Sequence, residues 1–146
     1  IDMAASAFSL YNTSKKYLMN GTVDLDTNTL KLKLCTSASN ASTFTLSTFA
    51  SVDNEISARG GYVANGDALT SVEVTSVLSA KSYSLDCADV VFTASGSALN
   101  NCKFAVIGIS GGKAICWSKL STSQFTISSP NTLTIQFHAN GIFEMH

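Results

Sequence analysis

Charged side chains are scarce in this chain of 146 residues, and that scarcity bears on what surrounds the protein. Asp, Glu, Lys and Arg together make up 13% of the sequence, whereas about a quarter is usual for a soluble domain. Surfaces that become buried against other proteins are depleted in charge. We therefore expect part of the exterior to be covered by a partner.

Arginine is almost absent, because Arg59 is the only one among the nine basic residues, and the net charge is -1. Nucleic-acid recognition depends on clustered Arg and Lys, so nucleic acid is not an expected ligand. Long apolar runs are missing too. No stretch approaches the ~20 apolar residues of a membrane helix, and Ile1–Leu10 lacks the layout of a signal peptide. A soluble protein without a membrane partner is expected.

Ligands for transition metals are also few. Of the two histidines, His146 is terminal, whereas His138 alternates out of phase with Phe137 and is expected to face solvent or a partner. The cysteines form no CxxC pair and lie among apolar neighbours, so we interpret them as buried thiols. Two disulfides are the alternative, and they would need an oxidising compartment. These four cysteines are Cys35, Cys87, Cys102 and Cys116.

The apolar pattern predicts one short helix followed by strands. Phe8–Met19 has the spacing of a helix, and Gly21 follows it as a stop signal. In Leu30–Leu34 leucine alternates with lysine, which predicts a strand with one wet face. Phe104–Ile109 is apolar at every position, so it is expected in the middle of a sheet covered on both sides. The second cover is either another layer of the domain or another subunit.

Turn residues predict how the later strands connect. Gly111-Gly112 is expected to turn the chain into the strand Ala114–Leu120, on which Ile115 and Trp117 share a face. Two further hairpins are predicted by Pro130-Asn131 and by Asn140-Gly141. The first of these turns would join Phe125–Ile127 to Leu133–Phe137, and the second would let Ile142–Phe143 pair back at the C-terminus. Earlier in the chain, Val72–Val74 alternates in the same way and predicts a further strand.

Together these elements predict an all-β protein, a single sandwich or barrel-like antiparallel β domain with one short N-terminal helix. Residues 1–146 form the single domain, and residues 1–21 form its N-terminal arm and short helix. Two polar tracts, Thr36–Thr48 and Ser51–Asp67, are predicted loops. They are long enough to carry function or to become ordered on assembly.

One catalytic pattern occurs, but its context argues against catalysis. Gly108–Gly112 spells G-x-S-x-G, the nucleophile elbow in which Ser110 would sit between a strand and a helix. Here a strand-like segment follows. The acid and histidine that should come next in order are limited to Glu144 and the terminal His146, because His138 precedes that acid. A glycine-rich hairpin turn is the preferred interpretation.

Acidic and aromatic residues offer no better site. Asp24–Asn28 resembles the opening of a calcium loop, but Thr29 and Cys35 stand where that loop needs Gly and Glu, so a turn is expected. Three further acids could in principle approach a cation, although strand ends or turns explain them as well. These acids are Asp67, Asp86 and Asp89, and the only candidates for an aromatic sugar platform are Tyr62, Tyr83 and Trp117.

One order of sequence blocks runs through nearly the whole chain, and its motifs are structural patterns rather than chemical signatures. The blocks are Phe8–Asn12, Tyr17–Gly21, Val23–Asp26, Leu30–Leu34, Glu55–Ile56, Gly61–Gly66, Ala68–Thr70, Asp89–Phe92, Phe104–Ile107, Phe125–Ile127 and Phe137–Ile142. This order of blocks resembles a family of small structural proteins of tailed bacteriophages.

The resemblance implies a non-enzymatic virion protein, assembled in the bacterial cytoplasm, that acts as a head decoration or cement subunit. Its partners would be the major capsid protein or other virion proteins, and a homo-oligomer, with a trimer favoured, would suit local threefold positions. A neck, tail or fibre-base component and a carbohydrate-binding β module are the alternatives. We assign no catalytic, metal-binding or cofactor-binding residue and expect no cofactor, and the partner-binding residues stay open.

Overall fold

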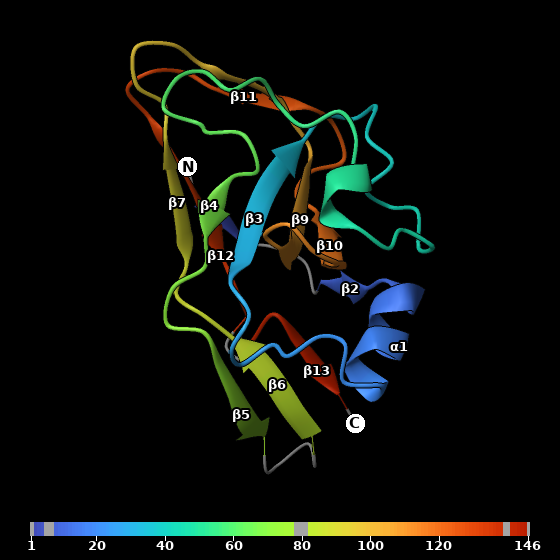
Figure 1. The fold of residues 1–146 in the computed structure, drawn as a ribbon. Coiled ribbons are helices and arrows are strands. Elements are labelled where there is room, and N and C mark those ends of the chain that lie inside the picture. The colour runs from blue at the N-terminus through green and yellow to red at the C-terminus, as the bar shows by residue number, and fades with distance from the viewer. Residues whose placement is uncertain (1, 5–7, 78–81, 139–140, 146) are drawn as a thin grey trace.

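The computed structural model describes residues 2–4, 8–77, 82–138 and 141–145 and confirms an all-β protein (Figure 1). Strands make up 41% of the chain, and one α-helix accompanies them. The helix is α1 (Asn12–Met19), and a short 3-10 turn is η1 (Phe49–Ser51). The strands are β1 (Asp2–Ala4), β2 (Ser9–Leu10), β3 (Leu30–Cys35), β4 (Asp67–Ala68), β5 (Glu73–Val77), β6 (Ser82–Asp86), β7 (Val90–Thr93), β8 (Leu99–Cys102), β9 (Phe104–Ile109), β10 (Ala114–Lys119), β11 (Phe125–Ile127), β12 (Thr132–Gln136) and β13 (Phe143–Met145).

A five-stranded antiparallel sheet in the order β2-β10-β9-β3-β4 forms the centre of the domain. The fully apolar β9 lies in its middle, as predicted, and Phe104 to Gly108 are all buried there. Gly111 turns the chain between β9 and β10 with φ +71°, a left-handed conformation that glycine adopts without a steric cost. The predicted hairpin between β9 and β10 is therefore confirmed.

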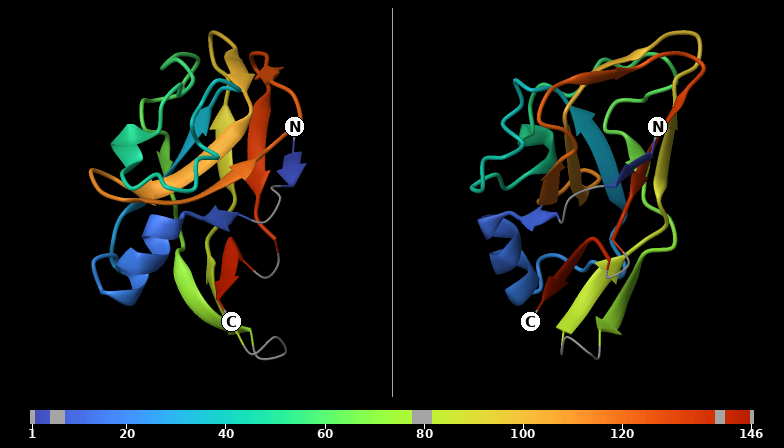
Figure 2. Two further views of the ribbon diagram at one scale, coloured as in Figure 1. Left: turned by 90° about the vertical axis from the view of Figure 1, so that its right-hand side faces the viewer. Right: turned by 180° about the vertical axis from the view of Figure 1, so that it is seen from behind.

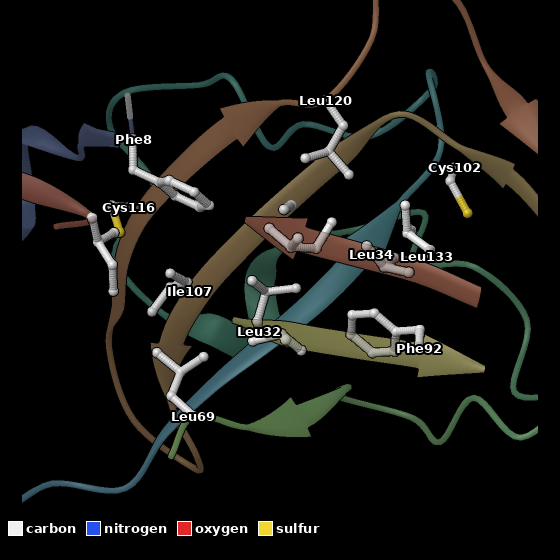
Figure 3. Close-up of a cluster of buried hydrophobic side chains, with 14 of the residues drawn as sticks. Phe8, Leu32, Leu34, Leu69, Phe92, Cys102, Ile107, Cys116, Leu120 and Leu133 are labelled. Carbon is white, nitrogen blue, oxygen red and sulfur yellow. The ribbon is translucent and has the colours of Figure 1, made fainter. Parts of the chain in front are cut away.

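A second sheet, in the order β1-β12-β7, covers one face of the central sheet. Strands β12 and β7 are antiparallel, whereas β1 runs parallel to β12. Leu32, Leu34 and Ile107 of the central sheet face Leu133 of β12 and Phe92 of β7 across the larger of two hydrophobic clusters, which we call the main core (Figure 3). All five side chains are nearly inaccessible to solvent. The two sheets thus form a sandwich, and no barrel closes.

The other face of the central sheet is covered by the chain itself rather than by a separate subunit. The segment around η1 folds over this face, and its buried residues Ala41, Phe49 and Val52 pack on β3, β9 and β10. We call this second layer the outer cluster. It consists of Tyr11, Cys35, Ala41, Phe49, Val52, Phe104, Val106 and Ala114.

A third sheet, in the order β13-β6-β5, lies at one end of the molecule, at the opposite end from β11 (Figures 1 and 2). Its strands are antiparallel, and β5 pairs with β6 over its whole length without a register shift. Val72 and Val74 were expected to lie in an alternating strand, and β5 begins between them at Glu73. A small two-stranded sheet, β11 with β8, completes the fold.

The predicted hairpin at Pro130-Asn131 is wrong. Asn131 N–H donates to the Ser128 carbonyl at 2.8 Å, so a turn does form there. The strands on its two sides nevertheless join different sheets, because β11 pairs with β8 and β12 lies between β1 and β7. Alternating apolar residues require a covered face, but they do not specify which strand supplies the neighbouring backbone.

The C-terminal turn also has a different partner from the one predicted. Asn140 of the predicted Asn140-Gly141 turn lies outside the described residues, and a single bridge joins His138 to Gly141. The following strand, β13, pairs with β6 instead of folding back on the preceding segment. Ile142 and Phe143 thereby enter the main core, where both are buried.

Two local predictions need correction near the central sheet. The helix begins at Asn12 rather than Phe8, because Ser9 and Leu10 pair with β10 as β2. Ile115 and Trp117 do not share a face. A register shift between Ala114 and Cys116 changes the alternation, so Ile115 enters the main core while Trp117 packs against the outer cluster.

Candidate functional site

Ser110 is exposed in the turn between β9 and β10, so a strand follows it where a nucleophile elbow needs a helix. Its N–H donates to the Thr29 carbonyl at 3.2 Å. The strand–turn–strand geometry lacks the helix N-terminus on which a nucleophile elbow depends. The side chain of Glu144 and the whole of His146 lie outside the described residues, and His138 is exposed. The interpretation of Gly108–Gly112 as a hairpin turn is confirmed.

The acidic residues named from the sequence hold turns and strand ends. Asp24 accepts a hydrogen bond from the Asp26 N–H at 3.0 Å, and the Thr27 hydroxyl and that N–H lower the pKa of its carboxyl. Asp86 accepts from the N–H of Cys87 at 2.9 Å and Asp89 from the N–H of Phe137 at 3.1 Å. Among the described residues, no three His, Cys, Asp or Glu side chains form a group that could hold a metal ion.

All four cysteines are free thiols. Burial raises the pKa of Cys35 and of Cys87 to about 12 and that of Cys102 to about 11, and it raises the pKa of Cys116 well above its usual range. A thiol must ionise before it acts as a nucleophile or a metal ligand. These thiols therefore stay protonated at neutral pH, and only Cys87 is partly open to solvent.

Lys33 is the residue whose environment the sequence pattern missed. Its place in β3 predicted exposure, but the side chain is 2% exposed, beneath the loop that covers the central sheet. The ammonium donates to the Phe49 carbonyl at 2.7 Å and lies 4.2 Å from the centroid of the Phe49 ring. Burial lowers the pKa of Lys33. This lysine fastens η1 to the sheet.

The long loop between η1 and β4 is held by a buried tyrosine and a carboxylate. The Tyr62 hydroxyl donates to Glu55 Oε1 at 2.6 Å and accepts the Leu34 N–H at 3.0 Å. The same Glu55 oxygen accepts the Asn65 N–H at 2.6 Å. Because Tyr62 is buried in this role, it cannot present a flat face to a sugar.

The three aromatic candidates therefore do not form a platform. Trp117 is partly buried and makes an edge contact with Phe104 at 6.1 Å between ring centroids. Tyr83 alone is freely exposed, at 62%. Stacking on a sugar ring needs an open aromatic face, and Tyr83 offers the only one of the three.

Tyr83 belongs to an apolar surface on the third sheet, which we call the β5–β6 patch. Val74 on β5 is 47% exposed, although it lies opposite the buried Leu85. A hollow of about 50 Å³ opens here, lined by residues of β5, β6 and β13 and by Leu25, and its lining is almost wholly apolar. The patch consists of Leu25, Val74, Tyr83, Ser84, Leu85 and Phe143.

Four other large apolar residues of the described chain are exposed, and they lie on α1, on two loops and on β7. They are Met19, Phe44, Val63 and Val91. No helix within the described ranges has the length and apolar character needed to cross a membrane.

Comparison with protein-family models, with curated proteins and with solved structures found no match to this chain.

Proposed function

We propose that this chain is a non-enzymatic structural protein of a tailed-bacteriophage virion, a decoration or cement subunit that binds and stabilises the outer head shell. The order of sequence blocks from Phe8 to Ile142 supports the family. The rigid sandwich and its low charge support the role, because a cement subunit needs a stiff core and a weakly charged surface to lie against protein.

One observation carries the proposal furthest. The described chain exposes Val74 and Tyr83 as diagonal neighbours on one face of a sheet that lies at one end of the molecule (Figure 2). Large apolar residues exposed together on one face, in a chain of which only 13% of the residues are charged, are typical of protein contacts. Each such contact is small, and many copies on one shell add their binding energies through multivalency.

Neighbouring copies and the major capsid protein are the proposed partners, and the virion is the proposed location. A symmetric oligomer on the shell, including the trimer that suits a local threefold position, remains part of this proposal. A neck or tail component would share the same fold and composition. Copy number separates the two locations, because the head surface repeats a site far more often than the neck or tail does.

The test is quantitative mass spectrometry of purified particles from a phage that encodes this chain. We expect on the order of hundreds of copies per particle, in proportion to the major capsid protein, whereas a neck or tail ring would give about six or twelve. Particles made without the chain should bind the added protein and regain it at the same ratio. Particles that neither contain nor bind the chain would exclude the proposed function.

A further inference from the structure

The outer edge of β5 is open, since no described strand pairs with it. An open edge presents a row of backbone N–H and C=O groups that a further strand can pair with. Monomeric proteins usually block such an edge with lysine, proline or a bulge. Residues 73–77 contain neither lysine nor proline, and their pairing with β6 is regular.

The exposed apolar residues lie beside this same edge. Val74 pairs with Leu85 and Ser76 pairs with Tyr83, so these four residues share one face of the sheet. Val74, Ser76 and Tyr83 are exposed on that face, and Leu85 is buried. A strand added to β5 would therefore gain backbone hydrogen bonds and cover apolar surface in the same step.

From this edge and its residues we infer that β5 pairs antiparallel with β5 of a second copy, which joins the two third sheets into one continuous six-stranded sheet. A two-fold axis at Thr75 places Thr75 opposite its own counterpart. Val74 then lies opposite Ser76 of the other copy. The small Ser76 leaves room for Tyr83 to reach across it toward the second Val74, roughly 9–10 Å away at two strand spacings.

The match of Val74 with the small Ser76 favours a second copy as the occupant, and the charge pattern permits it. Glu73 is the only charged residue in β5, and antiparallel pairing places it opposite position 77 of the other copy. The two Glu73 residues then lie at opposite ends of the junction, roughly 13 Å apart along the strands. That distance exceeds the Debye length of about 8 Å at physiological ionic strength, so their repulsion is screened.

This inference goes beyond the proposed function, because it concerns the purified chain in solution and holds whatever particle the chain belongs to. An isologous contact joins copies two by two. A threefold ring on a shell would use a different surface and is compatible with it.

The first test is the molar mass of the purified chain across a concentration series in analytical ultracentrifugation. We expect the mass to rise from 15.3 kDa toward twice that value. Val74→Lys should raise the dimer Kd at least tenfold, because it places ammonium groups at the junction. Val91→Lys is the matched control, since Val91 is 50% exposed on the outer strand β7, and it should leave the Kd unchanged.

The second test is a cysteine at the proposed axis. Thr75→Cys brings two thiols together at Cα separations of about 4.5–5.5 Å, within the range that a disulfide spans. Mild oxidation should give a covalent dimer from Thr75→Cys and none from Val91→Cys. A wild-type chain that stays monomeric throughout, or a dimer that Val74→Lys leaves intact and Thr75→Cys does not link, would overturn the inference.

Discussion

Replacing Lys33 by methionine tests how the outer cluster is held together. Methionine keeps the unbranched apolar stem and removes the ammonium. The variant loses a charged hydrogen bond to the Phe49 carbonyl, worth about 1.5–3 kcal/mol, and a cation–π contact, worth about 0.5–2 kcal/mol. The carbonyl keeps a partner, because the Val52 N–H also donates to it at 3.3 Å.

The variant gains stability because it no longer buries an ammonium group. Withdrawing an ammonium from water costs several kcal/mol even after a protein relaxes around it. The pKa of Lys33 is lowered by burial, although the nearby Cys35 and Glu55 act in the opposite direction. Burial therefore outweighs the attractions. We expect Lys33→Met to be as stable as the wild type or more stable, by about 1–2 kcal/mol.

The pH dependence of the stability difference between Lys33→Met and the wild type is an independent test. The pKa of Lys33 is lower in the folded chain than its ordinary value of 10.5. Between those two values the unfolded chain binds more protons, so this residue makes the folded state more stable as the pH rises. The advantage of Lys33→Met over the wild type should be largest at neutral pH and should shrink as the pH approaches 10.5.

Urea unfolding followed by Trp117 fluorescence is the assay, because Trp117 packs against the outer cluster. Lys31→Met is the control on the same strand, and it should stay within about 0.5 kcal/mol of the wild type because Lys31 is only partly buried. A loss of more than about 2 kcal/mol for Lys33→Met at an unchanged m-value would refute the reasoning, since it would show that the ammonium stabilises the fold on balance.

Three other predictions follow from close contacts. Gly108→Ala should destabilise the fold by about 1–3 kcal/mol in urea unfolding, because a Cβ there would lie 2.3 Å from Cδ1 of Phe49. Adding Phe49→Leu to this variant should recover part of the lost stability. Equal stability of Gly108→Ala and the wild type would contradict this prediction. Tyr62→Phe should cost about 1–3 kcal/mol and speed hydrogen exchange of the Leu34 amide, because that buried donor loses its acceptor; unchanged exchange would argue against it. Mass spectrometry after iodoacetamide at neutral pH should find label first on Cys87, the one thiol partly open to solvent, and on all four only after unfolding; rapid labelling of the other three would be inconsistent with their burial.

The sequence predicted the elements whose signals are local. The apolar run Phe104–Ile109 belongs at the centre of a sheet because every position needs cover. Gly111 and Gly112 connect it to the next strand through a tight turn, which only nearby residues determine. Thiol burial and the turn at Asp24 were likewise predicted, since small apolar surroundings and Asx side chains leave clear patterns.

Features that depend on distant segments were not predicted. Lysine alternating with leucine in β3 looks the same whether its polar face meets water or a loop from later in the chain, so the burial of Lys33 was missed. The turn after Ser128 gave no information on the strands that pair with β11 and β12. β11 pairs with β8, and β12 lies between β1 and β7. The bulge before Cys116, which separates Ile115 from Trp117, has no sequence signal comparable to a glycine turn.

The β5–β6 patch was missed for a related reason. Val74 belongs to an alternating pattern that predicts one buried face, and the paired Leu85 is indeed buried. Only the position of the sheet at the end of the molecule leaves Val74 and Tyr83 in solvent. Their exposure is a property of the assembled fold and could not be read from either strand alone.

The claim on which the account depends is that this chain works by being covered by other protein surfaces in a particle. A cryo-electron microscopy map of the intact virion at side-chain resolution tests it most directly. We expect repeated copies of the sandwich on the outer head shell, with the β5–β6 patch in contact with neighbouring subunits. A map in which the head, neck and tail are all accounted for without this chain would contradict the claim.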